Sequence, residues 1–291
     1  MASGVFTVQS NSSLLNGMVL SGGTWSIGSG ATLTLGGTTS WIGTGQMTGG
    51  GTVRNAGIMI YATTVARSIP TTFENTGSFT HSGLFVLQIN SGTSFENQSG
   101  GVFNLSSVLT SPISRLSSGG AFNNSGTIRK TNTGTTSLLT VPIYLQNGTV
   151  EAQQGQLDLG GSGTVSYDGG QFIAAAGAIL RFSGGSIWKG RFTGSGAGQV
   201  KVNGRSYSID DPGAYFDFPN GLVNWTASTN GGTMTVEANS YLDVSLASTT
   251  TGPQFTCTMN VLGTLTRSTG GLFFNTTGVL NILPAACLLP T

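Results

Sequence analysis

The chain has 291 residues, of which 47 are glycine and 37% are hydrophobic. Only 7% of the residues are charged, whereas an ordinary soluble domain has about 25%. The 11 basic groups nearly balance the 10 acidic groups, so the chain lacks the long-range field that attracts nucleic acid or anionic lipid. Because no stretch approaches the ~18 consecutive apolar residues of a membrane-spanning helix, we expect neither a nucleic-acid partner nor membrane insertion.

Short strands separated by turns begin near the N-terminus. Between residues 5 and 61, apolar residues alternate with polar ones, as in Thr32–Leu35, and glycine or asparagine closes each run. A period of two is typical of strands that have one buried face. Tracts rich in Gly and Ser also occur in disordered linkers, but the 15 Phe and 4 Trp residues favour an ordered all-β protein.

Two short units alternate through the middle of the chain. Phe122–Ile128 is similar to Leu145–Val150, and Gly155–Gly161 is similar to Gly177–Phe182. The step from one copy to the next is nearly the same for both units, as the positions of their asparagines and leading glycines show. A fixed period in the twenties is the mark of a solenoid, in which no single repeat can bury its own apolar face.

These repeats predict one architecture for residues 1–291. We expect a single parallel β-helix (β-solenoid) of about a dozen coils, each of about 20–27 residues, with no large helical cap. In each coil every second residue points inward, so that Leu157 and Leu159 are buried while Asp158 faces solvent. A β-sandwich of short strands is the weaker alternative, since it does not need the same unit at a constant step.

Asparagine recurs at one place in the repeat. Its side chain tolerates the left-handed backbone conformation of corners, and amides stacked coil upon coil can hydrogen-bond along a ladder. The candidate ladder or corner residues are Asn55, Asn75, Asn97, Asn124 and Asn147.

The pattern becomes irregular around residues 186–232, where we expect a loop-rich patch. Basic, acidic and aromatic side chains gather there, and one interpretation is a binding loop protruding from the solenoid. The favoured alternative is that opposite charges pair across neighbouring coils and the aromatic rings cover a wider turn. The candidate binding-loop residues are Arg205, Tyr207, Asp210, Asp211, Tyr215 and Trp225.

The chain has two cysteines, Cys257 and Cys287, both near the C-terminus. Residues about one coil apart stack near the strand spacing of about 4.8 Å, which is within the reach of a disulfide. Two buried free thiols are the equal alternative. Neither the number nor the spacing of these cysteines resembles a metal site.

The two ends of the chain carry no visible signal or cap. Met1–Phe6 lacks a basic segment followed by an apolar run, so we expect no signal peptide. The segment Ala285–Pro290 is apolar where a solenoid needs a polar cap. We expect that the chain either is part of a longer solenoid or meets other copies of itself head to tail, which yields a filament when the contact does not close.

The sequence shows no constellation for catalysis. Glycoside hydrolysis needs two carboxylates at a set separation, but the adjacent acids Asp210 and Asp211 point to opposite faces of a strand. His81 is the only histidine, and no acid or nucleophile lies within its unit. We therefore expect no catalytic residues, no cofactor and no metal, although a carbohydrate-active β-helix enzyme stays the third function hypothesis.

The repeats resemble those of large β-helical bacterial surface proteins. The segments 122–128, 148–151 and 177–185 are similar to units of autotransporter passenger regions and of filamentous-haemagglutinin-like regions. The resemblance implies an extracellular or cell-surface location in bacteria and an adhesive or scaffolding role. Our leading hypothesis is a non-enzymatic, self-associating scaffold whose partners are other copies of the chain. The second is an adhesin that binds surface glycans through solenoid faces or loops.

Overall fold

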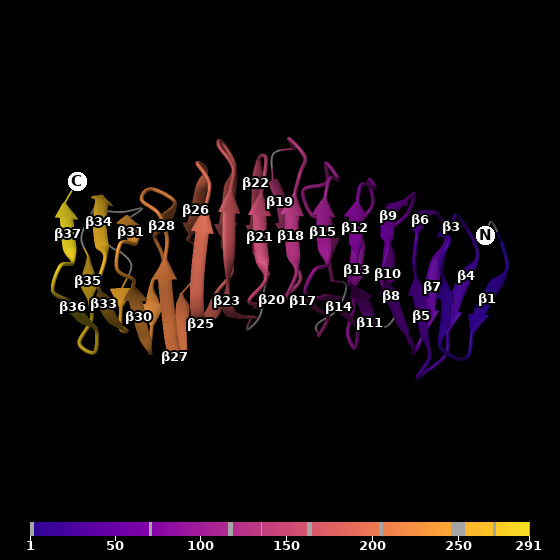
Figure 1. The fold of residues 1–291 in the computed structure, drawn as a ribbon, viewed down its shortest axis with the longest axis horizontal. Coiled ribbons are helices and arrows are strands. Elements are labelled where there is room, and N and C mark those ends of the chain that lie inside the picture. Colours follow the sequence, from indigo (N-terminus) through magenta and orange to yellow (C-terminus); the bar gives the residue numbers. More distant parts are fainter. Residues whose placement is uncertain are drawn as a thin grey trace. The chain divides into compact units, whose positions relative to one another are not determined.

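A computed structural model describes residues 3–69, 72–115, 119–134, 136–161, 165–203, 206–245, 254–269 and 272–290. The described residues form strands and turns, and none of them lies in a helix. The chain divides into two compact units, unit 1 (Met1–Tyr144) and unit 2 (Leu145–Thr291). In both, successive coils stack strand upon strand (Figure 1).

Unit 1 has three strands in each coil, and these form three rows. The β1 row contains β1 (Val5–Val8), β4 (Thr24–Ile27), β7 (Gln46–Gly49), β10 (Arg67–Ile69), β13 (Leu87–Ile89), β16 (Ile113–Ser114) and β19 (Thr136–Leu139). The β2 row contains β2 (Ser12–Leu14), β5 (Thr32–Leu35), β8 (Thr52–Asn55), β11 (Thr72–Asn75), β14 (Ser94–Asn97) and β17 (Ala121–Asn124). The β3 row contains β3 (Met18–Leu20), β6 (Thr38–Gly43), β9 (Ile58–Thr63), β12 (Ser78–His81), β15 (Val102–Leu105) and β18 (Thr127–Lys130).

Unit 2 also has three rows, two of which share long strands. One begins at β20 (Ile143–Gln146) and continues through β23 (Val165–Ala174), β25 (Ser186–Ser195) and β27 (Tyr207–Asp217) to β29 (Thr229–Asn230), β32 (Gln254–Phe255) and β35 (Phe273–Phe274). The second begins at β21 (Thr149–Ala152), uses the latter halves of β23, β25 and β27, and ends in β30 (Thr233–Val236), β33 (Thr258–Val261) and β36 (Val279–Ile282). The third, called here the β22 sheet, contains β22 (Gln156–Leu159), β24 (Ile179–Phe182), β26 (Gln199–Val202), β28 (Val223–Trp225), β31 (Tyr241–Ser245), β34 (Thr264–Thr269) and β37 (Cys287–Pro290).

Within each sheet, strands of successive coils pair in parallel, whereas in the β1 row β7 and β10 belong to separate sheets, as do β16 and β19. The register is direct, so that Phe73 lies beside Phe95. The step from coil to coil varies, since it is shorter from Val5 to its partner Thr24 than from Asn97 to its partner Asn124. The prediction of an all-β parallel β-solenoid is therefore confirmed.

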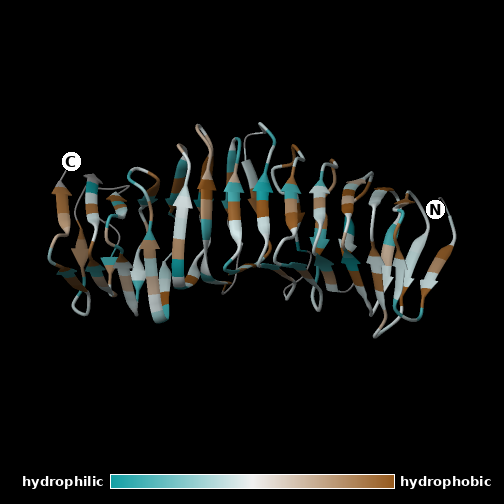
Figure 2. Cartoon of the chain, viewed as in Figure 1, coloured by the Kyte–Doolittle hydropathy of each residue, from teal (hydrophilic) through white to brown (hydrophobic). Residues whose placement is uncertain are grey.

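Alternation along each strand builds the core. Hydropathy changes from residue to residue along the arrows, with apolar bands between polar ones (Figure 2). In unit 1 the inward Phe rings stack coil on coil, with centroids 5.0 Å apart for Phe73 and Phe95 and 4.7 Å apart for Phe95 and Phe122. Such aromatic pairs contribute about 0.5–1.5 kcal/mol each beyond the burial of their area.

Glycine follows the asparagine at the corners of unit 1 because the backbones of successive coils meet there. Gly77 lies against Gly57 of the preceding coil, and a Cβ atom on Gly77 would lie 2.1 Å from the Gly57 carbonyl oxygen. The same oxygen accepts the hydrogen bond from the Ser78 amide at 2.8 Å. No side chain fits without displacing the coil.

The segment expected to be a loop-rich patch is regular, which corrects that prediction. Within it, β25 has ten residues and β27 has eleven, and β27 is the longest strand in the described part of the chain. These strands continue through a corner at which the pairing register shifts. Their inward rings pack around Trp188, whose centroid lies 4.7 Å from that of Phe192 and 5.4 Å from that of Trp225. Burial of these aromatic side chains favours extended backbone over a loop.

Candidate functional site

A row of polar side chains crosses the outer surface of the β22 sheet in unit 2. Strands β22, β24, β26, β28, β31 and β34 each contribute one residue, in register with its neighbours. The members of this polar row, in order, are Asp158, Arg181, Lys201, Asn224, Asp243 and Thr266. Because parallel strands lie about 4.8 Å apart, side chains of adjacent members are within reach of one another.

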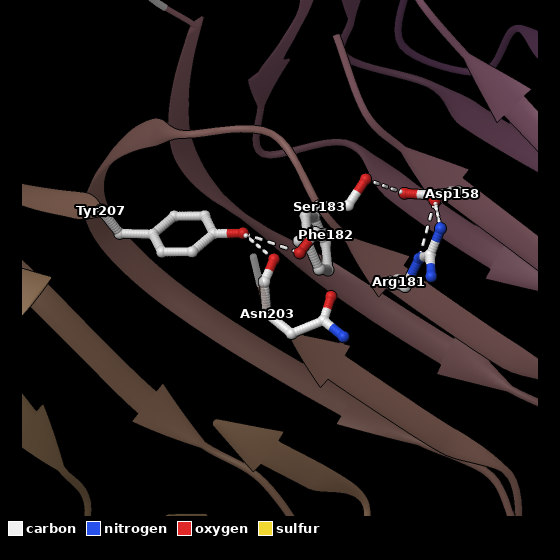
Figure 3. Close-up of polar contacts among 6 residues, drawn as sticks. All are labelled: Asp158, Arg181, Phe182, Ser183, Asn203 and Tyr207. Carbon is white, nitrogen blue, oxygen red and sulfur yellow. Dashed lines mark hydrogen bonds and ion pairs between the residues drawn. The ribbon is translucent and has the colours of Figure 1, made fainter. Parts of the chain in front are cut away.

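The first pair of the polar row is a buried ion pair (Figure 3). Asp158 is fully buried, and its Oδ2 accepts a hydrogen bond from Arg181 Nε at 2.7 Å as well as one from Nη2. Its Oδ1 accepts a hydrogen bond from the Ser183 hydroxyl at 2.6 Å. The expectation that Asp158 faces solvent was wrong, because its carboxylate is satisfied by these two side chains and covered.

Two tyrosines lie inward of this pair. The Tyr207 hydroxyl donates to the Phe182 carbonyl oxygen at 2.6 Å, and the Asn203 carbonyl oxygen is a second acceptor at 3.1 Å (Figure 3). Burial raises the pKa values of Tyr167 and Tyr207, and the negative charge of Asp158 raises both further. Both phenols therefore stay protonated at neutral pH and act as structural donors.

A pocket of about 230 Å³ opens at the centre of the polar row. Its lining residues are Gln199, Lys201, Gly221, Val223, Asn224 and Asp243. Asn224 Nδ2 donates to Asp243 Oδ2 at 2.7 Å and lies 2.8 Å from the Ser245 hydroxyl, so this side of the pocket is held in one geometry. Thr266 donates to Asp243 Oδ1 at 3.2 Å.

The side chains on the other side of the pocket are not hydrogen-bonded within the described residues. Among the described residues, the ammonium of Lys201 and the amide of Gln199 make neither a hydrogen bond nor an ion pair. Lys201 and Asp243 therefore place opposite charges on one pocket without neutralising each other. The pocket thus presents donors and acceptors together.

The candidate binding-loop residues do not converge on one site. Tyr207 and Trp225 are core residues with ring centroids 5.6 Å apart, and the Trp225 indole donates to the Ala227 carbonyl oxygen at 2.9 Å. Asp210 and Asp211 are exposed on β27. These placements correct the proposed binding role of Tyr207 and Trp225, since neither presents a surface to a partner.

The other two candidate binding-loop residues are Tyr215 and Arg205. Tyr215 is 36% exposed on β27, where its hydroxyl donates to the Pro212 carbonyl oxygen at 3.4 Å. Arg205 lies outside the described residues.

Opposite charges pair across coils, which is the alternative that the sequence favoured for this segment. Lys189 lies 3.5 Å from Asp168, and Arg191 lies 2.5 Å from Asp217 and 3.4 Å from Glu237. The hydrogen bond from Arg191 lowers the pKa of Asp217. These pairs are largely exposed, so each contributes little to stability.

Four of the five candidate ladder residues form a buried chain of amides in unit 1. Nδ2 of Asn55 donates to Asn75, Asn75 to Asn97, and Asn97 to Asn124, each at 2.7 Å. Asn147 is instead an exposed corner residue with φ of 56°. The ladder satisfies polar groups inside the coils and leaves no amide for a ligand.

The candidate disulfide is not formed, and both cysteines are free thiols. Cys257 is buried and Cys287 is exposed. The register explains the separation: Thr258, the neighbour of Cys257, pairs with Val279, whereas Cys287 pairs with Thr264 in the β22 sheet. The spacing of the cysteines therefore does not place the two sulfur atoms in the same column.

The polar row was not predicted as a site. The signal that could have found it is the step from Asp158 to Arg181, which places opposite charges side by side on paired strands. The described residues contain no cluster of three or more His, Cys, Asp or Glu side chains that could hold a metal ion. They also contain no helix with the length and apolar character needed to cross a bilayer.

Comparisons with known proteins identify no homologue. No protein-family model matches the chain, and no curated protein or solved structure is significantly similar to it.

Proposed function

We propose that this protein is a non-enzymatic structural protein that associates with other copies of itself in the extracellular space or on a bacterial cell surface. We also propose that it is related to the β-helical bacterial surface proteins that its repeats resemble. The charge content of 7% supports it, because little electrostatic repulsion opposes contact between such surfaces.

The observation that supports the proposal is the apolar inward face of the last coil described in unit 2, which either a further coil of a longer solenoid or another copy would cover. Leu265 is 1% exposed, but Leu288, its partner in the next coil, is 48% exposed. Val261 is likewise fully buried, whereas its partner Ile282 is 44% exposed. These inward side chains would each gain roughly 1 kcal/mol if a further coil covered them.

The backbone of the same coil supports association in one orientation. Strands β36 and β37 pair with β33 and β34 on one edge, and the groups on their other edge are suited to a further parallel strand. The first coil of unit 1 offers strands β1 to β3, each of which, among the described residues, pairs with the next coil on one edge only. We assign the first coil of a second copy as the occupant, which gives a head-to-tail contact.

The test is sedimentation velocity and negative-stain electron microscopy over a range of concentrations. We expect the unmodified protein to form concentration-dependent assemblies, and the double variant Ile282→Lys, Leu288→Lys to abolish them. Val108→Lys is the matched control, since Val108 is 68% exposed but lies in unit 1 between β15 and β16. Isolated single copies at every concentration, or assemblies that the double variant leaves unchanged, would refute the proposal.

A further inference from the structure

We infer that the pocket of the polar row is a binding site for a neutral, hydroxyl-rich saccharide. The inference does not depend on self-association, because every lining residue belongs to unit 2. It rests on three features of the pocket: the mixture of donors and acceptors, the presence of both signs of charge, and its open rim and small volume.

Sugar hydroxyls both donate and accept hydrogen bonds, and the pocket offers partners for both. Lys201 supplies up to three donors, and the Gln199 amide supplies donors and an acceptor. The Asp243 carboxylate supplies acceptor oxygens, held in place by Asn224 and Thr266. A ligand with several hydroxyl groups would bond Lys201 and Asp243 through different hydroxyls, on either side of Asn224.

The charges in the pocket select against charged ligands. An anionic ligand attracted by Lys201 would meet the Asp243 carboxylate in the same pocket. A cationic ligand attracted by Asp243 would meet the Lys201 ammonium. Repulsion between like charges disfavours both kinds of ligand, so a neutral ligand with hydroxyl groups fits both sides of the pocket.

The rim and the volume of the pocket suit a sugar ring. Val223 lines the base of the pocket but is only 4% exposed, because its side chain belongs to the inward face of the strand. Gly221 has φ of 77°, and no atom lies within 4 Å of the position of its missing Cβ, so the rim is open. The volume of about 230 Å³ is below the ~300–1,000 Å³ of drug-sized sites, which favours one ring, with neighbouring rings lying along the polar row.

The test combines a glycan array with titration calorimetry on the full chain. The array contains neutral and acidic oligosaccharides, and calorimetry is then run with the neutral oligosaccharide that binds. We expect Gln199→Ala and Lys201→Ala each to weaken binding about tenfold, as the loss of one or two hydrogen bonds requires. Because neither side chain has a partner among the described residues, these variants keep the contacts of the fold.

The matched control is Lys189→Ala, which removes a lysine of β25 that is paired with Asp168 outside the pocket. We expect it to bind as the unmodified protein does. Asp243→Asn tests the acceptor side and is checked for folding by its thermal unfolding temperature. Running the array also on the Ile282→Lys, Leu288→Lys variant separates binding by the pocket from multivalent binding by assemblies.

Three results would overturn the inference. One is that no neutral oligosaccharide on the array binds. The second is that a neutral oligosaccharide binds but the pocket variants bind it as the control does. The third is that only acidic oligosaccharides bind, with affinity lost in ~0.5 M salt and in Lys201→Ala but kept in Asp243→Asn, which would show an anion site.

Discussion

Acidification is expected to destabilise unit 1 through His81. This side chain of β12 is fully buried, and its ring centroid lies 4.8 Å from that of Tyr61. Neither ring nitrogen has a hydrogen-bond partner among the described residues. Burial lowers the pKa of His81 from 6.5 to about 4, and nearby backbone groups of His81, Phe85 and Pro112 offset only part of that effect.

The sign and size of the effect follow from proton binding. Between the unfolded pKa of 6.5 and the folded pKa of about 4, the unfolded chain binds a proton that the folded chain does not. The contribution of the neutral His81 to the unfolding free energy is therefore at its maximum above pH 6.5, and it falls as the pH is lowered toward 4. The difference between the two pKa values corresponds to about 3 kcal/mol of unfolding free energy, and about 2 kcal/mol of it is lost by pH 5.

The assay is urea unfolding followed by circular dichroism at about pH 7.5 and about pH 5, for the unmodified protein and for His81→Leu. Leucine is a matched replacement, since Leu105 is the partner of His81 in the next coil. The pKa of Tyr61 is raised to about 12 by burial, so this neighbour stays neutral at both pH values. We expect the unmodified protein to lose about 2 kcal/mol more than the variant, and equal losses would refute the reasoning.

Three further predictions concern packing, the buried ion pair and the thiols. Gly77→Ala places a Cβ 2.1 Å from a backbone oxygen and should lower the unfolding free energy by about 2 kcal/mol or more. The control is Gly50→Ala, whose Cβ would lie 3.5 Å from the nearest atom and which should change the unfolding free energy by less than about 1 kcal/mol. Similar melting temperatures for the two variants would contradict this prediction. Arg181→Met leaves the buried Asp158 carboxylate without its cation and should lower the unfolding free energy by about 2–3 kcal/mol, near the low end for buried pairs because the arginine is partly exposed. An unchanged denaturant midpoint would argue against a stabilising ion pair. In the folded protein Cys287 should react with a thiol reagent while Cys257 does not, since burial raises the pKa of Cys257 to about 11; equal labelling rates would show that Cys257 is accessible.

The features that repeat in the sequence could be predicted, because each depends on a short local pattern. Alternation placed Phe73, Phe95 and Phe122 inside successive coils. The recurring asparagines indicated a ladder, and the structure forms it from Asn55 to Asn124. No knowledge of distant contacts is needed for either, since the same environment returns in every coil.

The polar row could not be predicted in this way, because it depends on register to the single residue. Aligning the glycines Gly155 and Gly177 sets Asp158 beside Leu180. The strands pair with a step that is longer by one residue, so Leu157 meets Leu180 and Asp158 meets Arg181. A slip of one residue moves a side chain to the opposite face of a strand. The extra residue at the corner cannot be recognised by aligning the repeats on their glycines.

The aromatic residues near Asp210 and Asp211 became candidates for a binding loop for a related reason. A stretch that mixes charges with Tyr207 and Trp225 is typical of a binding loop. The structure places it in strands β27 and β28, where alternation sends both rings inward. The length of β27, which continues through a corner, cannot be inferred from repeats of shorter strands.

The two faces of the β22 sheet support the proposed binding site in the polar row. The inward column is uniform and buried, with Leu157, Leu180, Val200, Val223, Leu242 and Leu265. The outward row uses a carboxylate, a guanidinium, an ammonium, an amide and a hydroxyl on adjacent strands. Where unit 1 stabilises its coils with polar groups, it repeats a single residue type in the asparagine ladder. Cohesion between identical coils requires no such variety, but recognition of a ligand with distinct donors and acceptors does.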